Sequence, residues 1–366
     1  LFIVGLGFAL QQIAANPLAI SMGDPATGSQ RLSMAGGINN LGTTIGPVLI
    51  SYAIFGSASA STTETDLNTL KAPYLLLGAA FLLVAAILYF SSVPNKIASE
   101  DTSASATDHH KDNSRKSAFS YPQLWLGMIG IFVYVGVEVA TQSNLPQYLN
   151  EGLGIPKESV SPYISLYWAS LMIGRWSAAV GAFGVSAATE KLLKLIVPFL
   201  AFGVFLGVNS GSENLSDFYP YAGVILLLIA GDYLSKGNPA RMLLIFAAMG
   251  ISALVIGMLT TGIVSVFAFM SVGLFCSTLW PCIFTLAVSG LGKHTGQGSS
   301  LLILMICGGG FISTLQGAVA ESIGIHYSYI VGVVCFAYLA FYAVTVMGIL
   351  KRQGIDYDAK ITGGGH

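Results

Sequence analysis

Charged residues are scarce in this sequence. Of its 366 residues, 9% are charged and 54% are hydrophobic, whereas soluble domains carry about 25% charged residues. The formal net charge of −1 offers no basic surface to a nucleic acid, so we expect no nucleic-acid partner. The composition excludes a water-soluble globular domain and predicts a polytopic membrane protein whose surroundings are the lipid bilayer.

Residue patterns that support enzyme chemistry are also missing. All five histidines fall in predicted loops, at a span edge or in the tail, so we expect no metal site. The cysteines lie in apolar stretches without C-x-x-C spacing, and we interpret them as buried small hydrophobic side chains. No G-x-x-x-x-G-K-[ST] pattern appears. We therefore expect no enzyme activity and no cofactor; a membrane enzyme is the weaker alternative.

Long apolar runs dominate what is present. A helix needs about 20 apolar residues to cross a bilayer, and these continuous runs do not fit the short alternating strands of a β-barrel. The runs predict an all-α fold. We place eleven spans at 1–22, 32–56, 73–93, 122–144, 162–183, 192–209, 219–235, 241–259, 263–289, 298–321 and 325–350.

Lys and Arg are distributed unequally between the two sides of the predicted bundle. One side collects 14 of the 16 basic residues, and the other holds only Lys71 and Lys157. The positive-inside rule makes the richer side cytoplasmic. That side includes the polar, Ser-rich segment 95–120, which cannot bury a core, and the tail 351–366. We predict a flexible cytoplasmic linker and a cytoplasmic C-terminus.

Glu138 is the acid placed deepest in a predicted span. An ionisable group at the centre of a span costs roughly 2.5–3.5 kcal/mol, so it needs a partner or a water-filled path. Gln142 follows one turn later on the same helix face. We interpret Glu138 as a substrate hydrogen-bond acceptor or a proton carrier, and as the candidate proton-coupling residue. The alternative is an acid that only stabilises the fold. Arg175, near the predicted cytoplasmic end of its span, is a gating candidate or snorkels to the surface.

Amides and indoles supply the candidate substrate contacts. Amides both donate to and accept from sugar hydroxyls, although they also link neighbouring helices. Indoles stack on sugar rings, although they also anchor spans at the interface. Pro281, directly after Trp280, is expected to break its helix and free backbone carbonyls. The candidate substrate-binding residues are Gln12, Asn16, Asn39, Asn40, Gln142, Asn144, Trp168, Trp280 and Gln316.

Four stretches resemble the fucose permease and glucose/galactose permease branch of the major facilitator superfamily. The most specific is WPCIFTLAVSGLGKHTGQGSSLLILMICGGG at 280–310. The others are AANP at 14–17 with GDPATGSQRL at 23–32, YVGVEVATQSNLPQYL at 134–149, and SLYWASLMIGRW at 165–176.

The resemblance implies twelve spans in two six-helix bundles that alternate access to a central sugar site. The chain would then be a fragment that lacks about three N-terminal spans. The implied regions are the remaining spans 4–6 of the N-terminal bundle at 1–94, the linker at 95–120, a C-terminal bundle at 121–350 with an extra hairpin at 192–235, and the tail at 351–366.

This sequence departs from the fucose permeases at positions that the resemblance marks as functional. Their fourth-span acid corresponds to Gln12 here, and their fifth-span Gln and Asn correspond to Gly36 and Asn39. These differences favour a hexose of the glucose/galactose type over fucose. They also leave open whether the coupling ion is H⁺ or Na⁺, and whether Glu138 or an upstream acid carries it.

We therefore expect a monomeric secondary active transporter of the bacterial inner membrane that imports a monosaccharide by cation symport. The alternatives are a fucose or other deoxyhexose permease, or a sugar sensor that does not transport. A drug exporter fits less well, because its cavity is expected to be mostly apolar rather than rich in amides.

Overall fold

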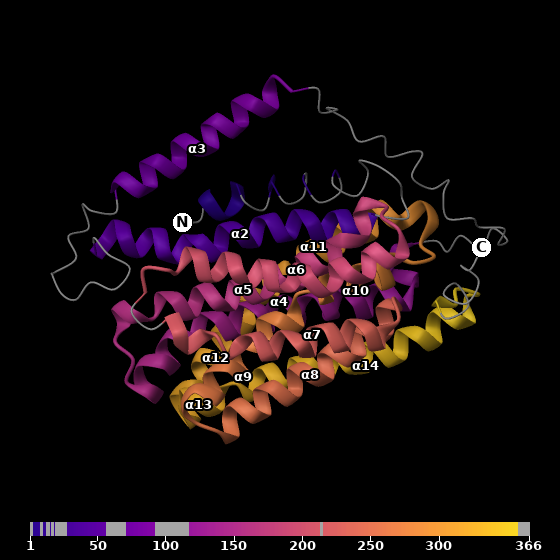
Figure 1. The fold of residues 1–366 in the computed structure, drawn as a ribbon. Helices are drawn as coiled ribbons and strands as arrows, with labels where there is room; N and C mark the ends of the chain where they lie inside the picture. Colours follow the sequence, from indigo (N-terminus) through magenta and orange to yellow (C-terminus); the bar gives the residue numbers. More distant parts are fainter. Residues whose placement is uncertain are drawn as a thin grey trace.

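The computed structural model describes residues 3–7, 10, 11, 15, 18, 28–55, 71–91, 117–212 and 215–357. Every regular element within these residues is helical (Figure 1). The first helices are α2 (Gly28–Phe55), α3 (Lys71–Tyr89), α4 (Pro122–Gln147), α5 (Ser161–Ala179), α6 (Ala187–Val208) and α7 (Tyr221–Ser235). They are followed by α8 (Pro239–Leu259), α9 (Gly262–Cys276), α10 (Leu279–Val288), α11 (Thr295–Leu304), α12 (Gly308–Ile323), α13 (Ile325–Ser328) and α14 (Ile330–Arg352).

The predicted all-α membrane fold is confirmed. Within the described residues, seven helical stretches are long and apolar enough to cross a membrane, and each matches a predicted span after residue 121. The predicted spans 32–56, 73–93 and 162–183 coincide with α2, α3 and α5. Most of the span predicted at 1–22 lies outside the described residues, as does the linker, apart from residues 117–120.

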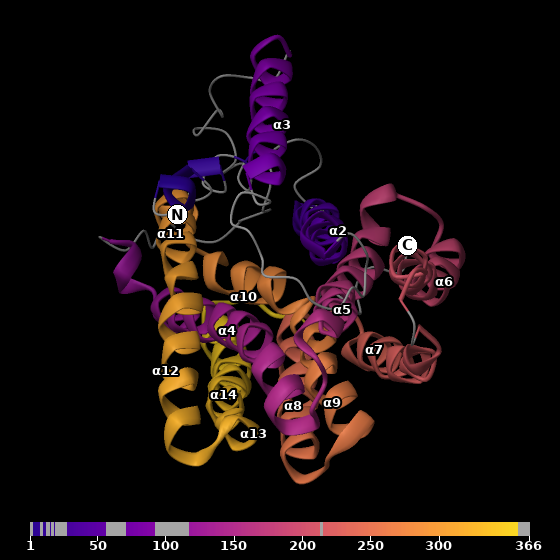
Figure 2. The same ribbon diagram turned by 90° about the vertical axis from the view of Figure 1, so that its left-hand side faces the viewer.

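Helix α4 forms the centre of the C-terminal helices, with α12, α14 and α10 packed around it (Figure 2). Glycine allows the closest of these approaches. A Cβ on Gly308, the first residue of α12, would overlap the backbone carbonyl of Phe132 on α4. Small residues at such seams let membrane helices gain van der Waals contact, since lipid gives no hydrophobic drive for association.

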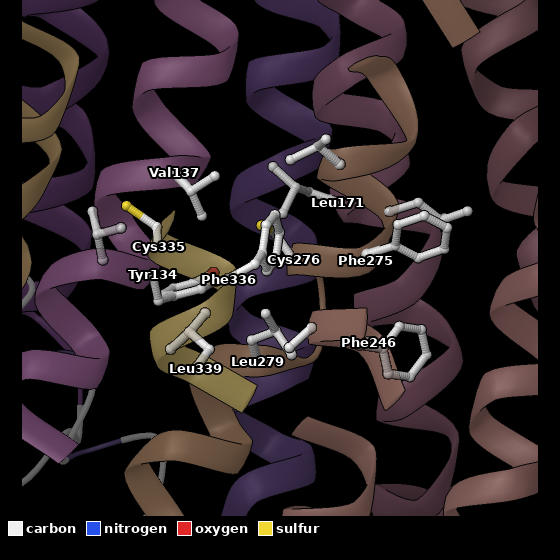
Figure 3. Close-up of a cluster of buried hydrophobic side chains, with 14 of the residues drawn as sticks. Tyr134, Val137, Leu171, Phe246, Phe275, Cys276, Leu279, Cys335, Phe336 and Leu339 are labelled. Carbon is white, nitrogen blue, oxygen red and sulfur yellow. The ribbon is translucent and has the colours of Figure 1, made fainter. Parts of the chain in front are cut away.

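An apolar cluster lies within these helices (Figure 3). Val137 and Phe336 are fully buried, as are the cysteines Cys276, Cys282 and Cys335 to within a few per cent. The interpretation of the cysteines as buried hydrophobic groups is therefore confirmed for three of the four. It is wrong for Cys307, which is exposed. Cys307 ends a 3₁₀ turn, Met305–Cys307, that interrupts the span between α11 and α12.

Proline explains the break between α9 and α10. Pro281 has no N–H to donate to the carbonyl of Ser277, and its ring clashes with that carbonyl. Helix α9 accordingly ends at Cys276, and α10 begins at Leu279. The sequence predicted a break beside Trp280; the structure places it one turn earlier, where the proline removes the hydrogen bond.

Helices α6 and α7 form a hairpin at the edge of the bundle, beside α5, α8 and α9 (Figure 2). Lys194 on α6 pairs with Glu190 at 3.3 Å and with Asp232 on α7 at 3.5 Å. The extra hairpin predicted at 192–235 has these two helices as its arms, and its assignment as an addition to the family fold stays a prediction.

The described N-terminal helices differ in how they pack. Helix α2 lies along α5, and the backbone carbonyl of Thr44 accepts a hydrogen bond from Ser165 Oγ at 2.8 Å. Helix α3 stands apart from the other helices in both views (Figures 1 and 2), and all of its described side chains are exposed.

Candidate functional site

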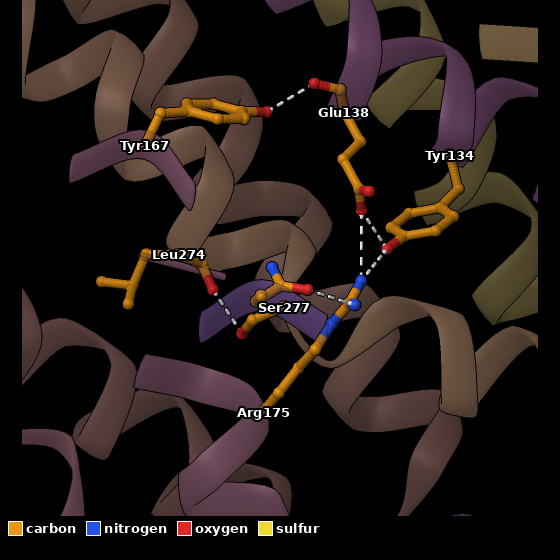
Figure 4. A network of polar contacts seen from close by, with 7 residues as sticks. Tyr134, Glu138, Tyr167, Arg175, Leu274 and Ser277 are labelled. Carbon is orange, nitrogen blue, oxygen red and sulfur yellow. Dashed lines mark hydrogen bonds and ion pairs between the residues drawn. The ribbon is translucent and has the colours of Figure 1, made fainter. Parts of the chain in front are cut away.

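A buried polar network connects α4, α5 and α2 (Figure 4). On α4, the Tyr134 hydroxyl donates a hydrogen bond to Glu138 Oε2 from one helical turn earlier. From α5, the Tyr167 hydroxyl donates to the backbone carbonyl of Glu138 at 2.7 Å. The Glu138 side chain is only 13% exposed. Burial disfavours a charged carboxylate unless opposite charge and hydrogen bonds compensate.

Arg175 on α5 supplies that compensating charge. Its Nη2 lies 3.5 Å from Glu138 Oε2 and donates to the Tyr134 hydroxyl at 3.2 Å. Its Nη1 donates to Asn40 Oδ1 on α2 at 2.8 Å. The Arg175 side chain is 14% exposed and lies inside the helix bundle. It does not snorkel to a surface, and its gating role stays a prediction.

Two glycines on α2 make room for α5 at this point. A Cβ on Gly36 would lie 3.0 Å from Arg175 Nη1, and a Cβ on Gly37 would lie 2.5 Å from Trp176 Cδ1. Gly36 stands where the resemblance places a glutamine in fucose permeases. The space beside that position holds the Arg175 guanidinium in this chain.

The two adjacent asparagines of α2 have different surroundings. Asn40 is 2% exposed and belongs to the network, whereas the neighbouring Asn39 is exposed. Successive helix positions point about 100° apart, so a single helix presents the two amides to different neighbours. Both stay predicted substrate residues, and the structure brings only Asn40 to Glu138 and Arg175.

Three other predicted residues lie near this network or on its helices. The Trp280 ring centroid lies 6.2 Å from that of Tyr134, and Trp280 also stacks on Phe284. Trp168 makes an edge contact with the neighbouring Tyr167. Gln142 is half-buried, one turn beyond Glu138. Each of the two predicted tryptophans therefore contacts a tyrosine of the network: Trp280 contacts Tyr134, and Trp168 contacts Tyr167.

The last predicted residues either bond elsewhere or lie outside the described part. Asn144 Nδ2 donates to the backbone carbonyl of Ala140 at 2.8 Å, and Gln316 Nε2 lies 3.4 Å from Ser328 Oγ. Asn144 therefore bonds to its own helix, whereas Gln316 on α12 reaches Ser328 on α13, which is the helix-linking alternative. Gln12 and Asn16 lie outside the described residues.

Sequence reasoning missed the two tyrosines and a surface cleft. Tyr134 precedes Glu138 by four residues, a helical spacing that could have signalled a contact; Tyr167 comes from another helix and gave no such signal. A cleft of about 500 Å³ also opens where α2 ends beside the connection from α4 to α5. Its lining residues are Pro47, Ile50, Pro146, Gln147, Asn150, Glu151, Lys157, Val160, Ser161 and Ile164.

The helices and the charged network buried among them define a polytopic membrane protein. The Major Facilitator Superfamily sequence profile matches residues 1–215. A protein named Glucose/galactose transporter from Brucella abortus is 32% identical over 346 residues, which cover 94% of this chain and 70% of that protein. The chain therefore belongs to the Major Facilitator Superfamily, and the resemblance of its sequence to the fucose and glucose/galactose permease branch is confirmed.

More distant relatives agree with this assignment. A protein named L-fucose-proton symporter from Escherichia coli is 23% identical over 368 residues, covering 94% of this chain and 70% of that protein. The crystal structure of the E. coli fucose:proton symporter FucP superposes with a TM-score of 0.63 at 21% identity, covering 94% of this chain and 75% of that chain. At this identity the structural match shows the fold.

Proposed function

We propose that this chain belongs to a secondary active transporter that imports a monosaccharide of the glucose/galactose type by cation symport. The observation that carries the proposal is the network of Glu138, Arg175 and Asn40, which joins α2 to α4 and α5 within the fold of sugar permeases. Alternating access requires two groups of helices to move against each other. We assign α2 to one of these groups and α4 and α5 to the other, so that these contacts would join the two groups. The relatives named glucose/galactose transporters support the sugar class.

Glu138 is the proposed coupling group. An acid that is buried next to a single cation can alternate between a charged, paired state and a neutral state, and that change is what a proton symporter needs. H⁺ is the proposed coupling ion and Na⁺ the alternative. The transporter is proposed to act as a monomer in the bacterial inner membrane, with the linker and C-terminus in the cytoplasm.

Uptake measurements test the proposal. Cells expressing the complete gene receive labelled glucose, galactose or L-fucose, with and without a protonophore. We expect concentrative hexose uptake that the protonophore abolishes. In Glu138→Gln, concentrative uptake is lost while counterflow exchange survives, because sugar still binds but no proton is carried. Glu321→Gln changes an exposed acid on α12 and is the matched control.

Three results would contradict the proposal. Absence of uptake or exchange of any of the three sugars would reject sugar transport and favour a sensor. Normal concentrative uptake by Glu138→Gln would reject Glu138 as the coupling acid. Preference for L-fucose over the hexoses would favour the deoxyhexose alternative.

A further inference from the structure

The side-chain amide of Asn40 has an unused donor. Its Oδ1 accepts a hydrogen bond from Arg175 Nη1 at 2.8 Å. Its Nδ2 is buried, and no described residue accepts a hydrogen bond from it. A buried donor without an acceptor is costly, and an incoming oxygen atom would relieve that cost. A sugar hydroxyl is such an acceptor.

Arg175 fixes the direction in which this donor points. A guanidinium has only donors, so the amide oxygen of Asn40 must face it and the amide nitrogen must face away. The alternative orientation would bring donor against donor. Gly36 keeps the contact open, because a Cβ there would lie 3.0 Å from Arg175 Nη1. A larger residue at position 36 would compete for the place of the guanidinium.

The other arm of Arg175 is held by α4. Four titratable groups interact with Glu138 from the elements packed around it: Tyr134 on its own helix, Tyr167 and Arg175 on α5, and Cys276 on α9. Of these only Arg175 carries a charge. A neutral Glu138 therefore releases Arg175 Nη2 from its carboxylate and leaves the guanidinium free to strengthen its contact with Asn40.

We propose that Arg175 is a positioning residue that directs Asn40 Nδ2 at a hydroxyl oxygen of the sugar and makes sugar affinity depend on the charge of Glu138. The inference rests on the proposed function and names Arg175 as the group that connects the coupling acid to the sugar-binding amide. A neutral polyhydroxylated ligand fits, since its hydroxyl oxygens accept hydrogen bonds from a buried amide donor. The order of contacts is Glu138, Arg175, Asn40 and sugar, and it links the proton to the substrate.

Sugar binding to the purified transporter, expressed from its complete gene, tests the first step. Labelled glucose and galactose are the probes. Asn40→Asp keeps an acceptor for Arg175 but has no amide donor, and Asn40→Leu removes both. We expect both variants to bind about tenfold more weakly, the loss of roughly one hydrogen bond. Lys194→Gln removes a cation from the pair in the α6–α7 hairpin and is the control with unchanged affinity.

A double-mutant cycle tests the coupling, which a purely structural role would not produce. Glu138→Gln is expected to tighten sugar binding about fivefold when Arg175 is present. In the Arg175→Gln background the same change is expected to alter affinity less than twofold. If Arg175→Gln does not fold, the sugar affinities of Arg175→Lys and of the Asn40 variants still test the proposal.

The outcomes separate this proposal from the proposed function. If the wild type binds none of glucose, galactose and L-fucose, the proposed function fails and this inference fails with it. If the wild type binds sugar but both Asn40 variants bind equally well, this inference alone is overturned. A Glu138→Gln effect that persists in the Arg175→Gln background also overturns it.

Discussion

Helices α4 and α3 are both long apolar helices, yet they pack in opposite ways. Helix α4 buries many of its side chains, among them Ile131, Val137 and Leu145 with no exposed area, whereas every described side chain of α3 is exposed. Side chains of other helices occupy the space beside the glycines of α4. A Cβ on Gly136, for example, would lie 2.5 Å from Ile312 of α12. Gly78 of α3 has nothing within 4 Å. Hydropathy thus identifies a span, and small residues at seams decide which spans pack closely.

The largest expected effect comes from the charged network of α4. Glu138→Ala would leave the Arg175 guanidinium buried without its carboxylate, a change that costs about 3–5 kcal/mol. Asp232→Ala breaks an ion pair whose side chains are 31% and 25% exposed, and we expect about 1 kcal/mol or less. Thermal unfolding of the purified protein in detergent measures both. Equal shifts in Tm would show that the network contributes no more than a peripheral pair.

A smaller effect is expected at the seam between α4 and α12. Gly308→Ala would bring a Cβ into the Phe132 carbonyl, and relieving the overlap should cost about 1–3 kcal/mol. Gly310→Ala, two residues along the same helix, meets nothing within 4 Å and should be neutral or stabilising by up to about 1 kcal/mol. The two Tm values test the seam directly. A Gly308→Ala protein as stable as wild type would mean that α12 can shift away without loss.

The smallest effect is expected on α3. Leu82 is 74% exposed, so Leu82→Ala should change the free energy of unfolding by less than about 0.5 kcal/mol. Leu339→Ala in α14 is the buried counterpart, with no exposed area, and should cost about 2–5 kcal/mol. Unfolding in detergent compares them under identical conditions. A large loss on Leu82→Ala would reveal that α3 packs against part of the protein.

Much of the fold could be predicted from the sequence, because apolar runs of span length have few alternatives in a bilayer. Even the break near Trp280 followed from Pro281. The position of the break did not, since it depends on the carbonyl four residues earlier. The exposed Cys307 was also misread, because an apolar neighbourhood in sequence does not say which face of a helix meets other helices.

Only part of the candidate site could be predicted from the sequence. Glu138 stood out as an acid within a span, but its partner Arg175 lies 37 residues away on another helix. A terminal position in its own span suggested a surface role for Arg175. Pairing across helices depends on how α4 and α5 are packed against each other, and that packing is set by many side chains together. The same dependence separates Asn40 from its neighbour Asn39.

Side-chain hydrogen bonds between the start of α4 and the residues after α14 affect how these helices unfold locally. Gln123 at the start of α4 and Gln353 after α14 exchange reciprocal side-chain hydrogen bonds at 3.1 and 3.0 Å. Tyr357 and Ser289 join the same end at 2.7 Å. Terminal helices usually fray first. Here α14 is joined to α4 by these side-chain hydrogen bonds, so local unfolding of α14 must first break them.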